Sequence, residues 1–234
     1  MSRHTPGSSP IRSDPCHFSK GQAGRLQCVI DAVIFDLDGV LVDAEQLWDQ
    51  ARRDLVDEAG GRWLPEATTA MLGMSSTEWS AYLHDELGVP LQVSEINERV
   101  VEGLLALYRR GLPLMPGAID AVHRMAKCWP LGLASSSNRP VIDAVLEFAK
   151  IDRDFAVTVS AEEVARGKPS PDIYLEAARR LSVAPATCAV IEDSANGIRA
   201  GVAAGMAVVA IPNPHFTPPD DVLSTAKVVL HAVS

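Results

Sequence analysis

Five short apolar runs are spaced along the chain, and each ends at polar, glycine or proline residues. The runs are 29-VIDAVIF-35, 131-LGLA-134, 156-AVTV-159, 189-AVI-191 and 207-AVVAI-211, with a weaker sixth at 227-KVVL-230. Their short length and their content of β-branched residues are typical of strands. Because the runs are apolar throughout rather than alternating, we expect strands that are buried on both faces.

Amphipathic stretches separate most of these runs and predict helices. They cover residues 116–127, 140–150, 171–181 and 194–204. Strands that alternate with helices and are buried on both faces indicate a parallel sheet. The predicted fold class is therefore α/β, with a Rossmann-like parallel sheet covered by helices on both faces.

The alternation is interrupted once, between the first and the second apolar run. Residues 36–130 separate these two runs, which is too long for a single crossover helix. Helical patterns recur within this span, at roughly 44–59, 77–87 and 94–110. The sequence therefore predicts an all-helical cap domain inserted after the first strand.

These patterns divide the chain into three parts. Residues 29–43 and 109–234 form the predicted catalytic core, and residues 44–108 form the predicted cap. Residues 1–28 are rich in Ser, Pro and Gly and predict a disordered arm. The arm has no apolar central segment of the kind that a secretory signal needs, and a targeting role for its basic residues is the alternative.

Negative charge is concentrated in the predicted cap. The whole chain has a formal net charge of −9, and residues 44–108 contain twelve Asp or Glu against four Arg, with no Lys. Because nucleic acids select basic surfaces, we expect no nucleic-acid partner. No apolar run approaches the roughly 18 residues that a membrane-spanning helix needs, so no membrane association is expected either.

The four cysteines lack the spacing of a metal site or of a disulfide framework. They are Cys16, Cys28, Cys128 and Cys188. This pattern predicts thiols that stay free in a reducing compartment, and hence a cytoplasmic protein. We also expect a monomer rather than an obligate oligomer.

Polar residues able to do chemistry follow four of the apolar runs. They are Asp36 and Asp38 after the first run, Ser135 and Ser136 after the second, Lys168 after the third, and Glu192 and Asp193 after the fourth. In an open parallel sheet, ligands bind beyond the carboxyl ends of the strands. The sequence therefore predicts that these side chains gather in one site.

Asp36 and Asp38 are the central pair of this predicted site. Side chains at i and i+2 of a strand share a face, so both carboxylates can point toward one ligand. One carboxylate can attack a group while the other moves a proton on its leaving oxygen. Taken alone, the stretch 36-DLDG-39 also fits an ordinary turn at the end of a strand.

Glu192 and Asp193 bring further acids to the same edge of the sheet. Carboxylates that face one another raise each other's pKa unless a cation lies among them. Oxygen ligands without imidazole or thiolate favour Mg²⁺. Each motif also has an ordinary interpretation: a helix N-cap at Asp193 or Ser194, a serine-rich loop at Ser135, and a solvated surface lysine at Lys168.

Together these residues resemble the motifs of the haloacid dehalogenase superfamily, in particular its Mg²⁺-dependent phosphatase and phosphomutase branch with a helical cap. The resemblance covers residues 29–211. It rests on 35-FDLDGVLVD-43, 133-LASSS-137, 167-GKPSPDIY-174 and 191-IEDSANGIRAGVAAGM-206. Small residues in the last motif, such as Gly197 and Ala200, would let a helix pack closely on the sheet.

The resemblance implies a catalytic role for several of these residues. Asp36 would be the nucleophile that forms an aspartyl-phosphate, and Asp38 would be the general acid and then the general base. Ser135, with Ser136, and Lys168 would bind the phosphoryl group that is transferred.

The resemblance also implies a bound Mg²⁺ ion. Asp36, the main-chain carbonyl of Asp38, and Asp193 would hold it, and Glu192 would contact it directly or through water. The positive charge of the metal and of Lys168 would neutralise the phosphoryl oxygens.

Particular residues separate the branches of the superfamily. A halide leaving group needs no proton, so Asp38 favours an oxygen leaving group, and the lysine-free cap disfavours phosphonate cleavage through a Schiff base. The β-phosphoglucomutase branch has a cap-side histidine and arginine at positions that correspond to Trp48 and Ser76 here. We therefore expect a phosphatase for a small phosphorylated metabolite, such as a sugar or polyol phosphate. The alternatives are a phosphomutase and a protein that only binds such metabolites.

Residues of the cap are expected to select the substrate. The candidates to face the site are Trp48, Met74, Ser75 and Ser76. For Trp79, packing in the core of the cap is the favoured interpretation.

Overall fold

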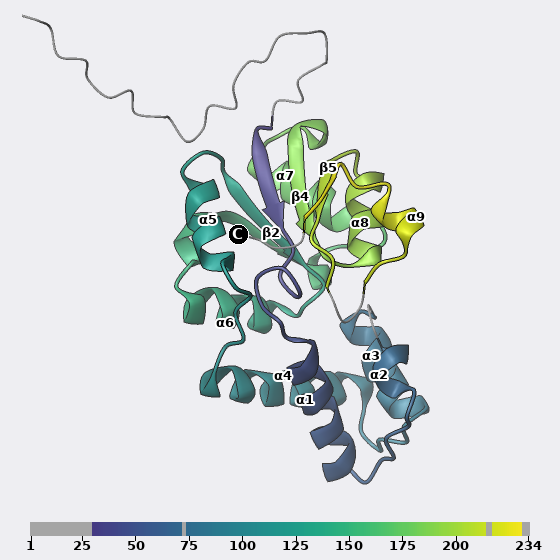
Figure 1. Cartoon of the computed structure of the whole chain (residues 1–234). Coiled ribbons are helices and arrows are strands. Elements are labelled where there is room, and N and C mark those ends of the chain that lie inside the picture. Colours follow the sequence, from purple (N-terminus) through teal and green to yellow (C-terminus); the bar gives the residue numbers. More distant parts are fainter. Residues whose placement is uncertain (1–29, 72–73, 214–216, 231–234) are drawn as a thin grey trace, which may run out of the picture.

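The centre of the molecule is a parallel sheet of six strands, in the order β3-β2-β1-β4-β5-β6 (Figure 1). This computed structural model describes residues 30–71, 74–213 and 217–230, so the predicted arm at 1–28 lies outside the described residues. The strands are β1 (Ala32–Phe35), β2 (Leu131–Ser135), β3 (Phe155–Ser160), β4 (Cys188–Glu192), β5 (Ala207–Ala210) and β6 (Val228–Val229). The predicted parallel sheet is confirmed.

Helices cover both faces of the sheet, as predicted. Along β1, Val33 and Phe35 belong to one buried apolar cluster, whereas Ala32 and Ile34 belong to another, because successive side chains of a strand point to opposite faces. The first cluster includes residues of α5 and α6, and the second includes residues of α7 and α8. These helices are α5 (Ala118–Ala126), α6 (Arg139–Ala149), α7 (Asp172–Leu181) and α8 (Ala195–Ala203).

An all-helical cap follows β1 and lies beyond the carboxyl ends of the strands (Figure 1). Its helices are α1 (Glu45–Glu58), α2 (Ala67–Ala70), α3 (Ser76–Asp85) and α4 (Val93–Arg110). Leu55, Leu83 and Leu104 of the cap belong to the same buried cluster as Val33 and Phe35, so the cap and one face of the sheet share a core.

The sequence predicted three of the four cap helices to within a few residues and missed α2. A helix of one turn is too short to show an apolar period. The short helix α9 (Asp220–Leu223) was missed for the same reason. Three 3₁₀ turns complete the described elements: η1 (Asp152–Asp154), η2 (Ala161–Glu163) and η3 (Pro185–Thr187).

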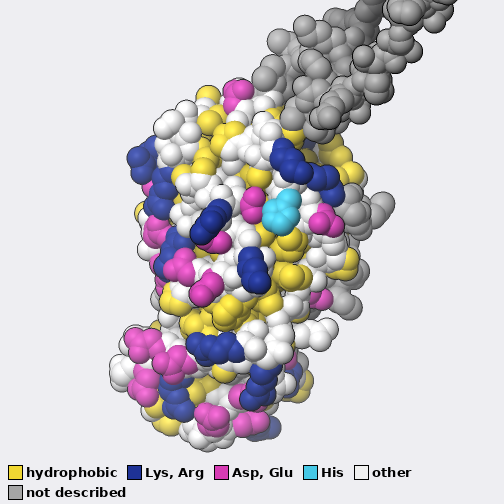
Figure 2. Space-filling model, turned by 90° about the vertical axis from the view of Figure 1, so that its left-hand side faces the viewer, with side chains coloured by type: hydrophobic (Ala, Val, Ile, Leu, Met, Phe, Trp, Pro, Cys, Tyr) yellow, Lys and Arg dark blue, Asp and Glu magenta, His cyan; other side chains and the backbone are white. Residues whose placement is uncertain are grey.

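Charged side chains of both signs are spread over the face that Figure 2 shows, and Asp and Glu gather on the cap at its lower end. This gathering agrees with the acidic excess of residues 44–108. None of the described helices combines the length and the apolar character that crossing a membrane requires.

One of the predictions about cysteines is wrong. Cys128 is disulfide-bonded, although all four thiols were expected to stay free. Spacing along a sequence does not reveal such a pairing, because a disulfide depends on proximity in the fold. Cys188 is buried and free, as predicted. Cys16 and Cys28 lie outside the described residues.

Candidate active site

The carboxyl ends of the central strands border a cavity of about 510 Å³. It lies where the strand order reverses, with β2 on one side of β1 and β4 on the other, which is the usual ligand position in such sheets. Five of the predicted site residues line this cavity: Asp36, Asp38, Ser136, Lys168 and Asp193. Ser135 and Glu192 are fully buried and are not among the residues that line it.

Lys168 contacts the carboxyl ends of three strands, β1, β2 and β4. Its Nζ donates hydrogen bonds to Asp36 Oδ1 at 2.5 Å, to Glu192 Oε1 at 2.7 Å and to the main-chain oxygen of Ala134 at 3.2 Å. Burial alone would lower the pKa of Lys168, but the two carboxylates outweigh it and raise the pKa well above its ordinary value. The side chain is only 6% exposed, so the alternative of a solvated surface lysine is wrong.

Asp36 is a buried carboxylate at the end of β1. Burial raises the pKa of Asp36 to about 7; Lys168 acts against this rise, and Glu192 and Asp38 add to it. A carboxylate attacks phosphorus only when it is ionised. The positive charge of Lys168 alone does not keep Asp36 ionised at low pH. A second cation in the cavity would lower the pKa of Asp36 and keep it ionised.

Asp38 occupies a different environment. Its Oδ2 accepts a hydrogen bond from Ser137 Oγ at 2.6 Å, and its Oδ1 is buried without a partner among the described residues. Burial raises the pKa of Asp38, against the hydrogen bond from Ser137 and the positive charges of Lys168 and Arg52. A carboxyl group that retains its proton in this way suits a proton donor. Ser137 ends the motif 133-LASSS-137, but sequence reasoning gave it no role.

Glu192 is completely buried, and both of its oxygens are engaged. Oε1 accepts hydrogen bonds from Lys168 Nζ and from Tyr174 Oη, each at 2.7 Å. Oε2 accepts from the main-chain N–H of Asp193 and from the main-chain N–H and the hydroxyl of Ser194, each at 3.0 Å. Burial would raise the pKa of Glu192, but Lys168 and these hydrogen bonds lower it.

Gly197 leaves the space that Glu192 occupies. A Cβ atom at Gly197 would lie 1.6 Å from Glu192 Oε1. The sequence interpretation, close packing of a helix on the sheet, is therefore incomplete at this position: the missing side chain accommodates a carboxylate. Tyr174 was part of a recognised motif but had received no role, because a tyrosine on an amphipathic helix gives no sign of a buried polar partner.

Asp193 faces the cavity because its neighbour forms the helix cap. Ser194 is the N-cap of α8, and its Oγ accepts a hydrogen bond from the main-chain N–H of Gly197 at 3.0 Å. The sequence had left open whether Asp193 or Ser194 is the N-cap, and the N-cap is Ser194. Gly39 has a φ of 81°, and a Cβ atom there would lie 1.9 Å from Asp193 Oδ2.

Three carboxylates form a candidate metal centre. Asp36, Glu192 and Asp193 each offer a ligand atom, and these atoms lie within 4.8 Å of one another. Burial, together with Glu192 and Asp36, raises the pKa of Asp193 well above its ordinary value. Among the described residues that line the larger cavity, Lys168 is the only cation. A cluster of three carboxylates with a single lysine to offset their charge fits a hard divalent cation such as Mg²⁺.

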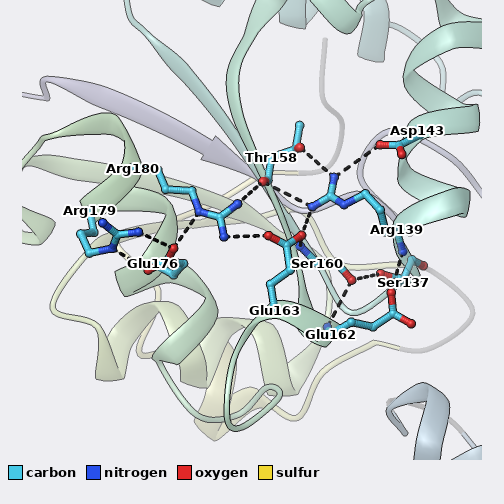
Figure 3. A network of polar contacts seen from close by, with 10 residues as sticks. All are labelled: Ser137, Arg139, Asp143, Thr158, Ser160, Glu162, Glu163, Glu176, Arg179 and Arg180. Carbon is cyan, nitrogen blue, oxygen red and sulfur yellow. Dashed lines mark hydrogen bonds and ion pairs between the residues drawn. The ribbon is translucent and has the colours of Figure 1, made fainter.

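Residues at the end of β3 and just after it form hydrogen bonds with the loop after β2 that contains Ser137 (Figure 3). Ser160 Oγ donates a hydrogen bond to the main-chain oxygen of Ser137 at 2.8 Å, and Glu162 accepts one from the main-chain N–H of Arg139 at 2.9 Å. The guanidinium group of Arg139 also pairs with Glu163. These contacts fix the position of Ser137, which in turn contacts Asp38.

The two predicted phosphate-binding serines have different surroundings. Ser135 is fully buried, and its Oγ accepts a hydrogen bond from the main-chain N–H of Ser137 at 3.0 Å. Ser136 lines the larger cavity and also a smaller one of about 110 Å³ beneath the cap. Their roles toward phosphate stay predictions.

Two of the four predicted cap residues reach the smaller cavity. Trp48 and Met74 line it, together with Trp79, for which packing in the cap core was the favoured interpretation, and Arg52, which sequence reasoning had not placed there. Ser75 and Ser76 do not line either of these two cavities. They lie at the start of α3, where Ser75 forms a capping box with Glu78.

Comparison with known proteins agrees with this geometry. The family model for haloacid dehalogenase-like hydrolases matches residues 30–205. Hexitol phosphatase B of Escherichia coli (strain K12) is 35% identical over 189 residues, which cover 78% of this chain and 84% of that protein. A bifunctional riboflavin kinase/FMN phosphatase of Arabidopsis thaliana is 34% identical over 80% of this chain, but the chain spans only 50% of that relative.

A solved structure is also similar over most of its length. CbbY from Rhodobacter sphaeroides, in complex with phosphate, has a TM-score of 0.79 and 28% sequence identity over 88% of this chain and 95% of that one. The family match covers most of the chain, and it includes the ends of β1, β2 and β4 that carry the carboxylates and serines. The protein therefore belongs to the haloacid dehalogenase-like hydrolases.

Proposed function

We propose that this protein is a Mg²⁺-dependent phosphatase that hydrolyses a small phosphorylated metabolite, such as a sugar or polyol phosphate. The observation that supports this proposal most is the buried contact of Lys168 with Asp36 at the edge of a carboxylate cluster. A phosphoryl group beside Asp36 would meet a fixed cation and a separate carboxyl group, Asp38, as its proton donor. The phosphatases among the relatives support the same reaction.

In the first step, a carboxylate oxygen of Asp36 attacks phosphorus and the bond from phosphorus to the ester oxygen breaks. Asp38 donates its proton to that oxygen, and the alcohol leaves. In the second step, Asp38 accepts a proton from a water molecule that attacks the aspartyl-phosphate. The bond from phosphorus to the Asp36 oxygen breaks, inorganic phosphate leaves, and both aspartates return to their starting forms.

Asp36, Asp193 and the main-chain oxygen of Asp38 would hold the metal. Glu192 would contact it through water, because its oxygens already accept five hydrogen bonds. When bound, Mg²⁺ supplies positive charge to the carboxylates and to the phosphoryl oxygens. Lys168, fixed between Asp36 and Glu192, provides positive charge from the protein itself.

The test is a screen of phosphate monoesters with Mg²⁺, with release of inorganic phosphate as the measurement. Asp36→Asn should lower kcat by at least about 10³-fold, because it removes the nucleophile. Asp31→Asn is a matched control, since Asp31 is exposed and lies just before β1. It should leave turnover unchanged.

Other results would contradict the proposal. Formation of glucose 6-phosphate from β-glucose 1-phosphate with a catalytic amount of bisphosphate, without net phosphate release, would identify a phosphomutase. Binding of phosphorylated metabolites by wild type and Asp36→Asn alike, with no turnover by either, would identify a binding protein.

A further inference from the structure

Arg52 is a buried cation that the proposed reaction steps do not use. It lies on α1, and only 6% of its surface is exposed. The guanidinium carbon lies 5.2 Å from the ring centroid of Trp48 and 5.1 Å from that of Trp79. The two ring centroids lie only 5.9 Å apart, so both rings contact the group from neighbouring sides, which restricts its position and favours its positive charge.

The hydrogen-bonding capacity of this guanidinium group is largely unused. Its nearest carboxylate is Glu45, whose Oε1 lies 4.0 Å from Nη1 of Arg52, beyond hydrogen-bond distance. Nε of Arg52 is buried without a partner among the described residues. A buried donor without an acceptor destabilises the protein, and an acceptor on a ligand would remove this cost.

The position of Arg52 indicates which part of a ligand it would contact. It lines the smaller cavity, of about 110 Å³, together with Glu45 on the cap side and Asp38 on the core side. In the proposed reaction Asp38 protonates the leaving oxygen. The part of the substrate that extends past Asp38 into this cavity is therefore the leaving group.

We propose that Arg52 and Glu45 bind hydroxyl groups of the leaving group and so select phosphate esters of polyhydroxylated alcohols. This inference rests on the proposed phosphatase function and assigns the residues that would determine its specificity. A hydroxyl group donates and accepts hydrogen bonds, which matches a guanidinium group beside a carboxylate. The hydroxyls of Ser136 and Ser137 line the same cavity and add partners of the same kind.

The charges around the cavity favour hydroxyl groups over a second anionic group. Among the described residues that line it, Arg52 is the only cation, and Glu45 and Asp38 are acids. A carboxylate or a second phosphate on the leaving group would face these acids with one guanidinium group to offset them. A neutral polyol meets no such repulsion.

A pair of esters that differ only in their hydroxyl groups tests this inference: sorbitol 6-phosphate and n-hexyl phosphate, both with Mg²⁺. In Arg52→Met, kcat/KM for sorbitol 6-phosphate should fall about tenfold to a hundredfold, the effect of losing a charged hydrogen bond. The value for hexyl phosphate should fall by less than about threefold. Arg52→Lys, which keeps the charge without the planar group, should lie between wild type and Arg52→Met.

The neighbouring arginine provides a matched control. Arg53 lies on the same helix, but it stacks on Trp63 at 4.3 Å and donates a hydrogen bond to Asp49 at 2.6 Å. It lines neither of the two site cavities. Arg53→Met should leave both substrates unchanged. Circular dichroism checks that each variant folds. If Arg52→Met does not fold, Arg52→Lys serves as the test variant.

A binding measurement separates failure of this inference from failure of the proposed function. In an Asp36→Asn background, calorimetry should give weaker binding of sorbitol 6-phosphate after Arg52→Met, with little change for hexyl phosphate. If wild type hydrolyses neither ester, the phosphatase proposal fails, and this binding result still decides the role of Arg52. Equal losses for both esters would overturn the inference. So would a larger loss for phosphoglycolate, because Arg52 would then recognise an anion.

Discussion

Gly39, which follows β1, lies against the carboxylate of Asp193, which follows β4. Because Gly39 has no side chain, this carboxylate can lie close to the end of β1. We expect Gly39→Ala to displace Asp193, because its Cβ would lie 1.9 Å from Oδ2 and its φ of 81° disfavours any side chain. Turnover should fall by about a hundredfold or more, and the Mg²⁺ concentration for half-maximal activity should rise. Activity measured across a Mg²⁺ titration checks both effects.

The control for this variant is a glycine with the same backbone conformation and no close neighbour. Gly88 has a φ of 70°, and a Cβ atom there would meet nothing within 4 Å. Gly88→Ala should lower stability by about 1 kcal/mol through backbone strain alone. It should leave the response to Mg²⁺ unchanged. If the two variants respond alike to Mg²⁺, collision with Asp193 is not the reason that residue 39 is glycine.

At the scale of elements, the start of α8 is held by one carboxylate, Glu192, which also accepts a hydrogen bond from Lys168. We expect Gly197→Ala to lower the free energy of unfolding by about 2–4 kcal/mol, because its Cβ would lie 1.6 Å from Glu192 Oε1. Displacing Glu192 would also leave Lys168 and Tyr174 without a shared acceptor. Urea unfolding followed by circular dichroism measures this change.

A second glycine inside a helix shows whether this loss is specific. Gly103 lies within α4, and a Cβ atom there would make an ordinary contact of 3.7 Å with Ala51. Gly103→Ala should raise the free energy of unfolding by up to about 1 kcal/mol, since alanine favours helix. A similar destabilisation in both variants would show that crowding at Glu192 is not the cause.

The elements that the sequence predicted well have a regular apolar pattern or are bounded by polar, Gly or Pro residues. The six strands and the helices that cover the sheet were recognisable because apolar runs end at polar or Gly/Pro residues, and because α7 and α8 lie next to Pro171 and Ser194. The helix α2 was not recognisable, because four residues hold no period. Position after a strand end was enough to predict that Asp36, Asp38, Lys168 and Asp193 line one cavity.

What the sequence could not show is which side chains meet across the fold. Arg52 carries an ordinary helical pattern, and only the tertiary fold brings Trp79 of α3 close to Arg52 and Trp48 of α1. Ser137 and Tyr174 likewise acquire their partners, Asp38 and Glu192, from parts of the chain far away in sequence. Such contacts depend on tertiary structure, for which a single sequence holds no local signal.

At the scale of the whole molecule, the carboxylate cluster links stability to pH and to metal. Burial raises the pKa of Asp36 from 3.8 to about 7 in the metal-free fold, so the folded protein holds this proton more tightly than the unfolded chain does. The stabilisation that protonation gives is complete below about pH 3.8 and is lost as the pH rises through about 7. Burial raises the pKa of Asp38 and Asp193 in the same direction.

We therefore expect the thermal midpoint in EDTA to fall by several degrees between pH 5 and pH 8. Saturating Mg²⁺ should recover most of this loss at pH 8, because a cation that binds only the folded cluster stabilises it. Asp36→Asn carries no charge at either pH, so its midpoint in EDTA should fall less. Calorimetric scans of both proteins, with EDTA and with Mg²⁺, measure the effect. An equal fall in both proteins would contradict the assignment to Asp36. A wild-type midpoint that rises toward pH 8 in EDTA would contradict the raised pKa values of Asp36, Asp38 and Asp193.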